Sequence, residues 1–131
     1  MSTMYSRSTV RLSQAKEALS KVSLDDAYLD TACFDTQQAI EFLIKAILLE
    51  SGVPYNRSHD IRYLLSLLKE NNFEFESSDA LELLADTITD WEESSRYGKG
   101  VRTSVQTVQR IHNLYDKMNS AFMAMQEKNQ N

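Results

Sequence analysis

The scarcity of glycine and proline constrains the fold of this chain more than any other feature of its sequence. Three glycines and one proline serve 131 residues. Sheet-rich folds need many tight turns, and tight turns rely on these two residue types. The sequence therefore predicts an all-α fold of long helices joined by few connections.

Apolar residues recur at helical spacing in five segments, at about residues 8–22, 24–51, 58–70, 78–93 and 102–126. Long helices with short connections favour antiparallel packing. We therefore predict a single domain, an up-and-down bundle of about five helices with a core at about 8–126 and a polar tail at 127–131. One domain is also what a chain of this length accommodates.

Several residues predict where these helices begin and end. Ser23 and Asp26 have the spacing of a capping box before the second helix, and Ser58 is a predicted N-cap of the third. Gly52 is expected to end the second helix, and Pro54 prevents its continuation. The second helix is apolar on more than one side, so we expect it to be central in the bundle.

Charge and composition narrow the possible functions. A net charge of −5 opposes long, nonspecific contact with nucleic-acid phosphates, so any such contact needs a local basic patch. Cys33 is the only cysteine, which suits a reducing compartment. The first residues contain no signal-like apolar run, and no window approaches the roughly 20 apolar residues of a membrane span. We expect a cytoplasmic protein with no membrane contact and no cofactor.

The first of two basic clusters comprises Arg57, His59 and Arg62, at the start of the third helix. Backbone N–H groups and the helix dipole favour an anion at such a position, and arginine adds charged donors. Alternatively, these residues cap the helix and face water.

The second basic cluster is the segment from Arg96 to Arg102, which includes Tyr97, Lys99 and two glycines. Its cations and exposed backbone amides could cradle a phosphate, although the spacing differs from that of a P-loop. A solvated basic loop is the equally open alternative.

Gln38, Glu41 and Lys45 share one face of the second helix, and Glu41 and Lys45 have favourable i,i+4 spacing. On so apolar a helix these groups could bond across to a loop residue such as Arg96. The alternative is a simple exposed strip.

The remaining polar residues predict structure more than chemistry. His112 and Cys33 fall on apolar stripes, so we expect a hydrogen-bonded core histidine and an unreactive packing thiol. No spacing of histidines or cysteines predicts a metal site. The fourth helix carries an acidic row that is either a solvated face or a docking surface for a basic partner, and this row consists of Glu82, Asp86, Asp90 and Glu93.

Three motifs carry a resemblance to the HEPN family. Residues 34–48, FDTQQAIEFLIKAIL, resemble the central helix of that family, with its QQA-x-E-x-x-x-K-A pattern. Gly52 followed by Ser58-His59-Asp60-Ile61 is similar to its glycine, spacer and H-D-L helix start. Arg96-Tyr97, after an acidic helix, is similar to its R-Y element. The resemblance spans about residues 12–125.

The resemblance implies a helical bundle, a homodimer, nucleotide or RNA handling, and partnership with a small nucleotidyltransferase in a toxin–antitoxin-like setting. Some members are ribonucleases that use an Arg, four to six residues, then a His. The positions where that Arg would precede a histidine hold other residues here, namely Val105, Gln106 and Thr107 before His112, and Gly52, Val53 and Pro54 before His59. The ribonuclease motif is therefore absent.

We accordingly predict a noncatalytic protein that binds a nucleotide or RNA phosphate or pairs with a nucleotidyltransferase. The predicted anion contact is Arg96, supported by Tyr97, His59, Arg62, Arg102 and Lys99. Two alternatives stay open: a ribonuclease with an unconventional site such as His59 plus Arg96, and a purely structural subunit that binds a partner through the acidic fourth helix.

Overall fold

The computed structural model describes residues 2–130, apart from the side chain of Arg96. Over those residues the chain forms five helices and no strand, so the predicted all-α bundle is confirmed. No helix in this part of the chain is long and apolar enough to cross a lipid bilayer. The helices are α1 (Thr3–Leu19), α2 (Ala27–Glu50), α3 (Ile61–Glu70), α4 (Ser78–Arg96) and α5 (Val105–Gln130).

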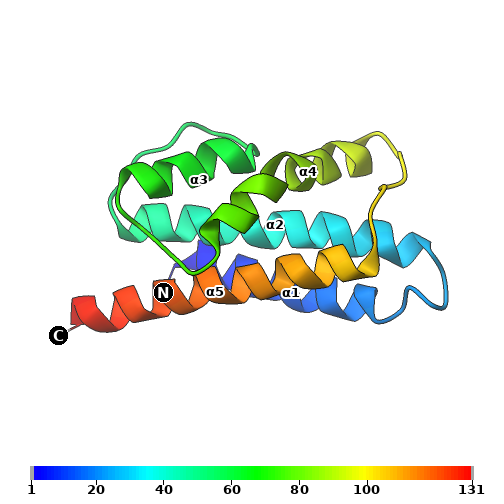
Figure 1. Ribbon diagram of the computed structural model, residues 1–131, viewed down its shortest axis with the longest axis horizontal. Helices are drawn as coiled ribbons and strands as arrows, with labels where there is room; N and C mark the ends of the chain where they lie inside the picture. Colours follow the sequence, from blue (N-terminus) through cyan, green and yellow to red (C-terminus); the bar gives the residue numbers. More distant parts are fainter. Residues whose placement is uncertain (1, 131) are drawn as a thin grey trace.

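Helix α2 is the centre of the bundle, as its sequence predicts. It packs against all four other helices, and its contact with α1 is the most extensive. Figure 1 shows α3 and α4 on one side of α2, and α1 and α5 on the other. A helix covered this way must be apolar on several faces, which explains why α2 has the most hydrophobic sequence of the five.

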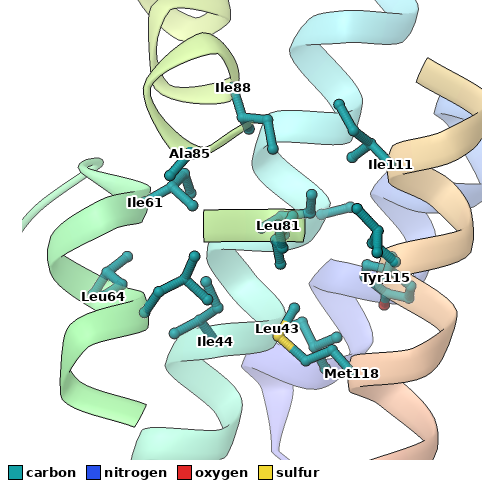
Figure 2. Close-up of a cluster of buried hydrophobic side chains, with 14 of the residues drawn as sticks. Leu43, Ile44, Ile61, Leu64, Leu81, Ala85, Ile88, Ile111, Tyr115 and Met118 are labelled. Carbon is teal, nitrogen blue, oxygen red and sulfur yellow. The ribbon is translucent and has the colours of Figure 1, made fainter. Parts of the chain in front are cut away.

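The core lies where the other helices converge on α2 (Figure 2). Ile44 points toward Leu64 of α3, while Leu43 points toward Met118 of α5. All four side chains are fully buried. Two consecutive residues of α2 therefore pack against two different helices, α3 and α5. These contacts hold α2 between the α3–α4 side and the α1–α5 side of the bundle.

The connection at residues 51–60 brings His59 to the polar face of α2. Gly52 follows the last turn of α2 with φ +70°, and Val53 N–H returns a bond to the Leu48 carbonyl at 2.9 Å. This left-handed residue ends the helix as predicted. The connection then doubles back over α2, so that α3 begins beside the middle of α2 (Figure 1).

The first two helix starts differ from the prediction. Helix α1 begins at Thr3, before the predicted residue 8, because the Ser2 hydroxyl accepts from Tyr5 N–H at 3.2 Å. The predicted capping box at Ser23 is wrong. Helix α2 is capped by Asp26, which makes no side-chain cap bond, and Ala27 N–H instead donates to Asp25 Oδ1 at 2.9 Å.

The later helix ends also shift. Ser58 does not cap α3; Asp60 does so, accepting from Tyr63 N–H at 3.3 Å. Helix α4 continues through Arg96, past the predicted end at residue 93. Helix α5 begins at Val105 and not at residue 102, because Ser104 Oγ accepts from Thr107 N–H at 3.1 Å. It then extends through the polar tail to residue 130.

Candidate functional site

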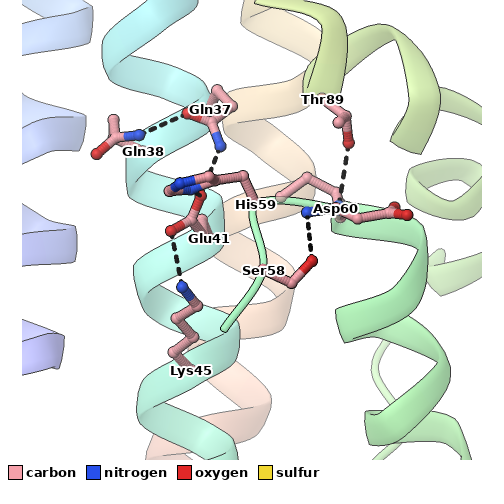
Figure 3. Close-up of polar contacts among 9 residues, drawn as sticks. Gln37, Gln38, Glu41, Lys45, Ser58, His59, Asp60 and Thr89 are labelled. Carbon is pink, nitrogen blue, oxygen red and sulfur yellow. Dashed lines mark hydrogen bonds and ion pairs between the residues drawn. The ribbon is translucent and has the colours of Figure 1, made fainter. Parts of the chain in front are cut away.

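A chain of hydrogen bonds follows the polar face of α2 (Figure 3). Gln37 Nε2 donates to Glu41 Oε1 at 2.8 Å, and Lys45 Nζ donates to Glu41 Oε2 at 2.9 Å. Gln38 Nε2 in turn donates to Gln37 Oε1 at 2.7 Å. Glu41 is only 1% exposed, so this face is a buried network and the alternative of an exposed strip is wrong for Glu41 and Lys45.

His59 completes this network from the 51–60 connection. Its Nδ1 lies 2.9 Å from Glu41 Oε1 (Figure 3). An ionised carboxylate can only accept hydrogen bonds, so Nδ1 of the ring must carry the hydrogen that it donates. The other ring nitrogen, Nε2, takes no part in this bond. The side chain of His59 is 53% exposed, whereas that of Glu41 is 2% exposed. A buried carboxylate thus orients a solvent-accessible imidazole.

Lys45 provides the compensating charge for Glu41. The Lys45 side chain is 10% exposed, and its ammonium also lies 5.8 Å from the centre of the Tyr55 ring. A buried carboxylate without a partner would cost several kcal/mol, so the pair must be kept together. Gln37 was not predicted as a member of this network, although its spacing of four residues before Glu41 places both on one helix face.

Arg62 is held by a different partner. Its Nε and Nη2 donate to the two carboxylate oxygens of Asp86 on α4, at 3.0 and 3.1 Å. Both side chains are exposed. This two-pronged pair raises the pKa of Arg62 and lowers that of Asp86, first through the hydrogen bonds and then through their charges. The charge of Arg62 is therefore already matched.

The second basic cluster lies along a cleft between α4 and the connection that follows it. The cleft has a volume of about 710 Å³. Lys99 and Arg102 are both exposed, and neither has an ion-pair partner among the residues the structure describes. The cleft is lined by Thr87, Asp90, Trp91 and Ser94 of α4 and by Lys99, Gly100, Val101 and Arg102.

Two backbone N–H groups of this connection donate hydrogen bonds that hold it against the bundle. Lys99 N–H donates to the Ser94 carbonyl at 2.9 Å, and Val101 N–H donates to Asp30 Oδ1 at the start of α2 at 3.0 Å. Gly98 has φ +67°, a conformation that favours glycine. Tyr97 is 62% exposed, and the side chain of Arg96, the main predicted contact, lies outside the described residues.

The predicted site residues thus fall in separate places. Asp30, which anchors the basic connection, precedes Glu41 by eleven residues, about 16 Å along α2. On α4, Thr89 accepts from Ile61 N–H at the start of α3, whereas Thr87 faces the cleft. Residues two apart differ by about 200° around a helix. The cleft and His59 therefore lie on opposite sides of α4.

His112 and Cys33 are core residues, as their positions on apolar stripes predict. His112 Nε2 lies 2.8 Å from Thr36 Oγ1, and burial, with a smaller contribution from Lys16, lowers its pKa to about 4. Burial raises the pKa of Cys33 to about 12, which makes it a poor nucleophile. Within residues 2–130 no group of three histidine, cysteine or acidic side chains is placed to hold a metal ion.

Comparison with known protein families agrees with the helical fold. The family model described as the HEPN domain matches residues 8–125, nearly the whole chain. The chain belongs to the HEPN domain family. Membership in the HEPN family supports a role related to nucleotides or RNA. No curated protein and no solved structure matches the chain.

Proposed function

We propose that this HEPN protein is a noncatalytic binding protein that holds the phosphate groups of a nucleotide in the cleft between α4 and the connection to α5, here named the α4–α5 cleft. The observation that carries the proposal is the pair of unmatched cations, Lys99 and Arg102, on a cleft of about 710 Å³. That volume falls in the range of roughly 300–1,000 Å³ typical of small-molecule sites. The protein has a net charge of −5, and these two cations offset its repulsion of an anion locally.

The other groups of the cleft suit a phosphate. The hydroxyls of Thr87 and Ser94 can donate to phosphate oxygens, and arginine can donate two parallel bonds. The connection leads into the N-terminus of α5, whose dipole also favours negative charge. Asp90 opposes an anion, so its charge sets a limit on affinity. The predicted homodimer and the predicted nucleotidyltransferase partner stay predictions.

Calorimetric titration with ATP and with pyrophosphate tests this site. Replacing Lys99 and Arg102 together by Ala should weaken binding about thirtyfold, since two charge-assisted bonds contribute at least about 2 kcal/mol. Asp90→Asn should strengthen binding about threefold, because it removes a nearby like charge. A parallel titration with oligouridine shows whether the cleft binds the phosphates of RNA or those of a free nucleotide.

A matched control removes the same charge elsewhere. Arg57 and Arg110 are exposed and make no ion pair within the described residues. The double change Arg57→Ala and Arg110→Ala should leave the affinity within about twofold, since neither residue lines the cleft. Equal weakening in both double variants, or no weakening in the cleft variant, would reject the proposal.

The Glu41–His59 pair favours a second candidate, a ribonuclease with an unconventional site. A carboxylate that fixes the tautomer of an accessible imidazole is an arrangement used in acid–base catalysis. The discriminating experiment is incubation of the purified protein with structured RNA beside a His59→Ala control. Cleavage that is lost in the control would establish this candidate and overturn the noncatalytic proposal.

A further inference from the structure

A second concavity lies between the end of α3 and the start of α4. It has a volume of about 230 Å³. Leu65 and Leu68 of α3 contribute its apolar wall, and Phe73 and Phe75 of the connecting segment contribute aromatic rings. No residue that lines the α4–α5 cleft also lines this concavity. It is therefore a separate site that the proposed function does not use.

The connection at residues 71–77 is built to hold these rings in place. Phe73 and Phe75 lie with ring centres 6.2 Å apart, and Phe73 N–H donates to the Leu68 carbonyl at 3.0 Å. Asn72 and Ser77 flank the segment in the left-handed region, at φ 61° and 65°. For residues other than glycine this conformation is strained, and such strain persists where the surroundings over-determine it.

Helix α5 braces the same connection from outside. Lys117 Nζ donates to Ser77 Oγ at 3.2 Å and to Glu76 Oε1 at 3.3 Å. A pocket that is formed before its ligand arrives costs less conformational entropy on binding. The bracing thus favours a preformed recognition pocket.

The rim of the pocket is acidic. Glu74, Asp79 and Glu82 line it, against Lys69 as the one cation among its lining residues. None of the three carboxylates forms an ion pair with another residue of the described chain. An apolar cavity with a net negative charge at its mouth is complementary to an apolar group that carries positive charge beside it.

We propose that this pocket docks a partner protein through one leucine-sized or phenylalanine-sized side chain that is flanked by lysine or arginine. The volume of about 230 Å³ lies below the roughly 300–1,000 Å³ of typical small-molecule sites, and it suits a single side chain. The flanking cations reach the rim carboxylates. A phosphate ligand is disfavoured here by the same charges that attract a basic segment.

The test uses the full chain, labelled with ¹⁵N, and the probe acetyl-Lys-Arg-Leu-Lys-Arg-amide. Amide shifts are expected at Leu65, Phe73, Phe75 and Ser78, because these residues line the pocket. Replacing the central leucine of the probe by alanine should weaken binding about tenfold, since it removes the buried group. The acidic probe acetyl-Glu-Glu-Leu-Glu-Glu-amide should not bind.

Substitutions on the protein separate charge from packing. The triple variant Glu74→Gln, Asp79→Asn and Glu82→Gln keeps the shape of the rim and should weaken the basic probe about tenfold, the effect of three exposed ion pairs. A matched control, Asp26→Asn, Glu50→Gln and Glu127→Gln, makes the same charge change at exposed positions elsewhere. It should leave binding within about twofold.

Three outcomes would overturn the proposal. The first is equal binding of the leucine and alanine probes, and the second is equal weakening by the triple variant and its control. The third is concentration-dependent shifts of the same amides without any probe, which would assign the pocket to a second copy of this chain.

Discussion

The buried carboxylate of Glu41 is the group on which the polar network of α2 depends. Its two oxygens accept from Gln37, His59 and Lys45, and almost none of its surface meets water. Lys45 is buried with it, so the network has no net charge when the imidazole is neutral. The three partners come from two segments of the chain, and the network therefore joins α2 to the 51–60 connection.

Removing that charge should destabilise the fold. Glu41→Gln leaves the Lys45 ammonium buried without a counter-charge, which we expect to lower the free energy of unfolding by about 3 kcal/mol. Urea denaturation followed by circular dichroism measures this change. Glu50→Gln, at the exposed end of α2, is the control and should stay within about 0.5 kcal/mol of the parent. A loss below about 1 kcal/mol in Glu41→Gln would contradict the role of the pair.

His112 predicts a specific dependence of stability on pH. Its pKa falls from 6.5 to about 4 on folding, mainly because burial disfavours the charged ring, with Lys16 adding to the effect and Asp116 opposing it. Between these values the unfolded chain binds the proton and the folded one does not. The stabilising contribution of neutral His112 is therefore fully present above pH 6.5, and it is lost as the pH falls toward 4.

Between pH 7.5 and pH 5 this histidine should lower the free energy of unfolding by about 2 kcal/mol. Urea denaturation across that range measures the slope, and the same series on His112→Gln isolates the contribution of this ring. The variant should show a flatter profile over this window, whatever its absolute stability. Identical slopes in the two proteins would show that His112 is not the titrating group.

At the scale of helices, the C-terminus of α2 depends on the backbone of Gly52. Nothing lies within 4 Å of a Cβ placed at Gly52 or at Gly100, so space limits neither position. Gly52 has φ +70°, whereas Gly100 lies outside the left-handed region. Gly52→Ala should therefore cost about 1 kcal/mol, and Gly100→Ala less than about 0.5 kcal/mol. Thermal unfolding of both variants checks this, and equal losses would contradict it.

The existence of the helices was predictable because their apolar period is strong, but several of their ends were not. Serine and aspartate are plentiful around residues 20–30 and 56–60, and each is a good cap. Near α3, Ser58 bonds to Asp60 N–H, which leaves Asp60 to cap the helix. Such competition among neighbouring caps depends on the path of the connection, which local sequence does not encode.

The candidate sites were predictable only in part for a similar reason. Helical spacing placed Gln38, Glu41 and Lys45 on one face, yet it could not say which segment covers that face. The doubled-back connection supplies His59 as the cover, through a contact 18 residues away in the chain. Likewise, Thr87 and Ser94 join the cleft with Lys99 and Arg102 only because the connection folds back on α4.

For the whole molecule, the balance between a net charge of −5 and one basic cleft predicts a weak salt dependence of RNA binding. Each phosphate neutralised on a single strand contributes a slope of about −0.7, so two cations give about −1.4 in log K against log salt. Fluorescence anisotropy with labelled oligouridine measures this slope. Replacing Lys99 and Arg102 by Ala should bring it near zero, whereas a parent slope steeper than about −4 would require many further phosphate contacts.

An NMR titration of the ¹⁵N-labelled protein with ADP tests whether the cleft binds phosphate. If the α4–α5 cleft holds the phosphates, the amides of Thr87, Ser94, Lys99 and Arg102 should shift together and saturably. The chemical shift of the His59 amide, on the other side of α4, should not change. Shifts confined to His59 and the polar face of α2, or no saturable shifts at all, would contradict the account.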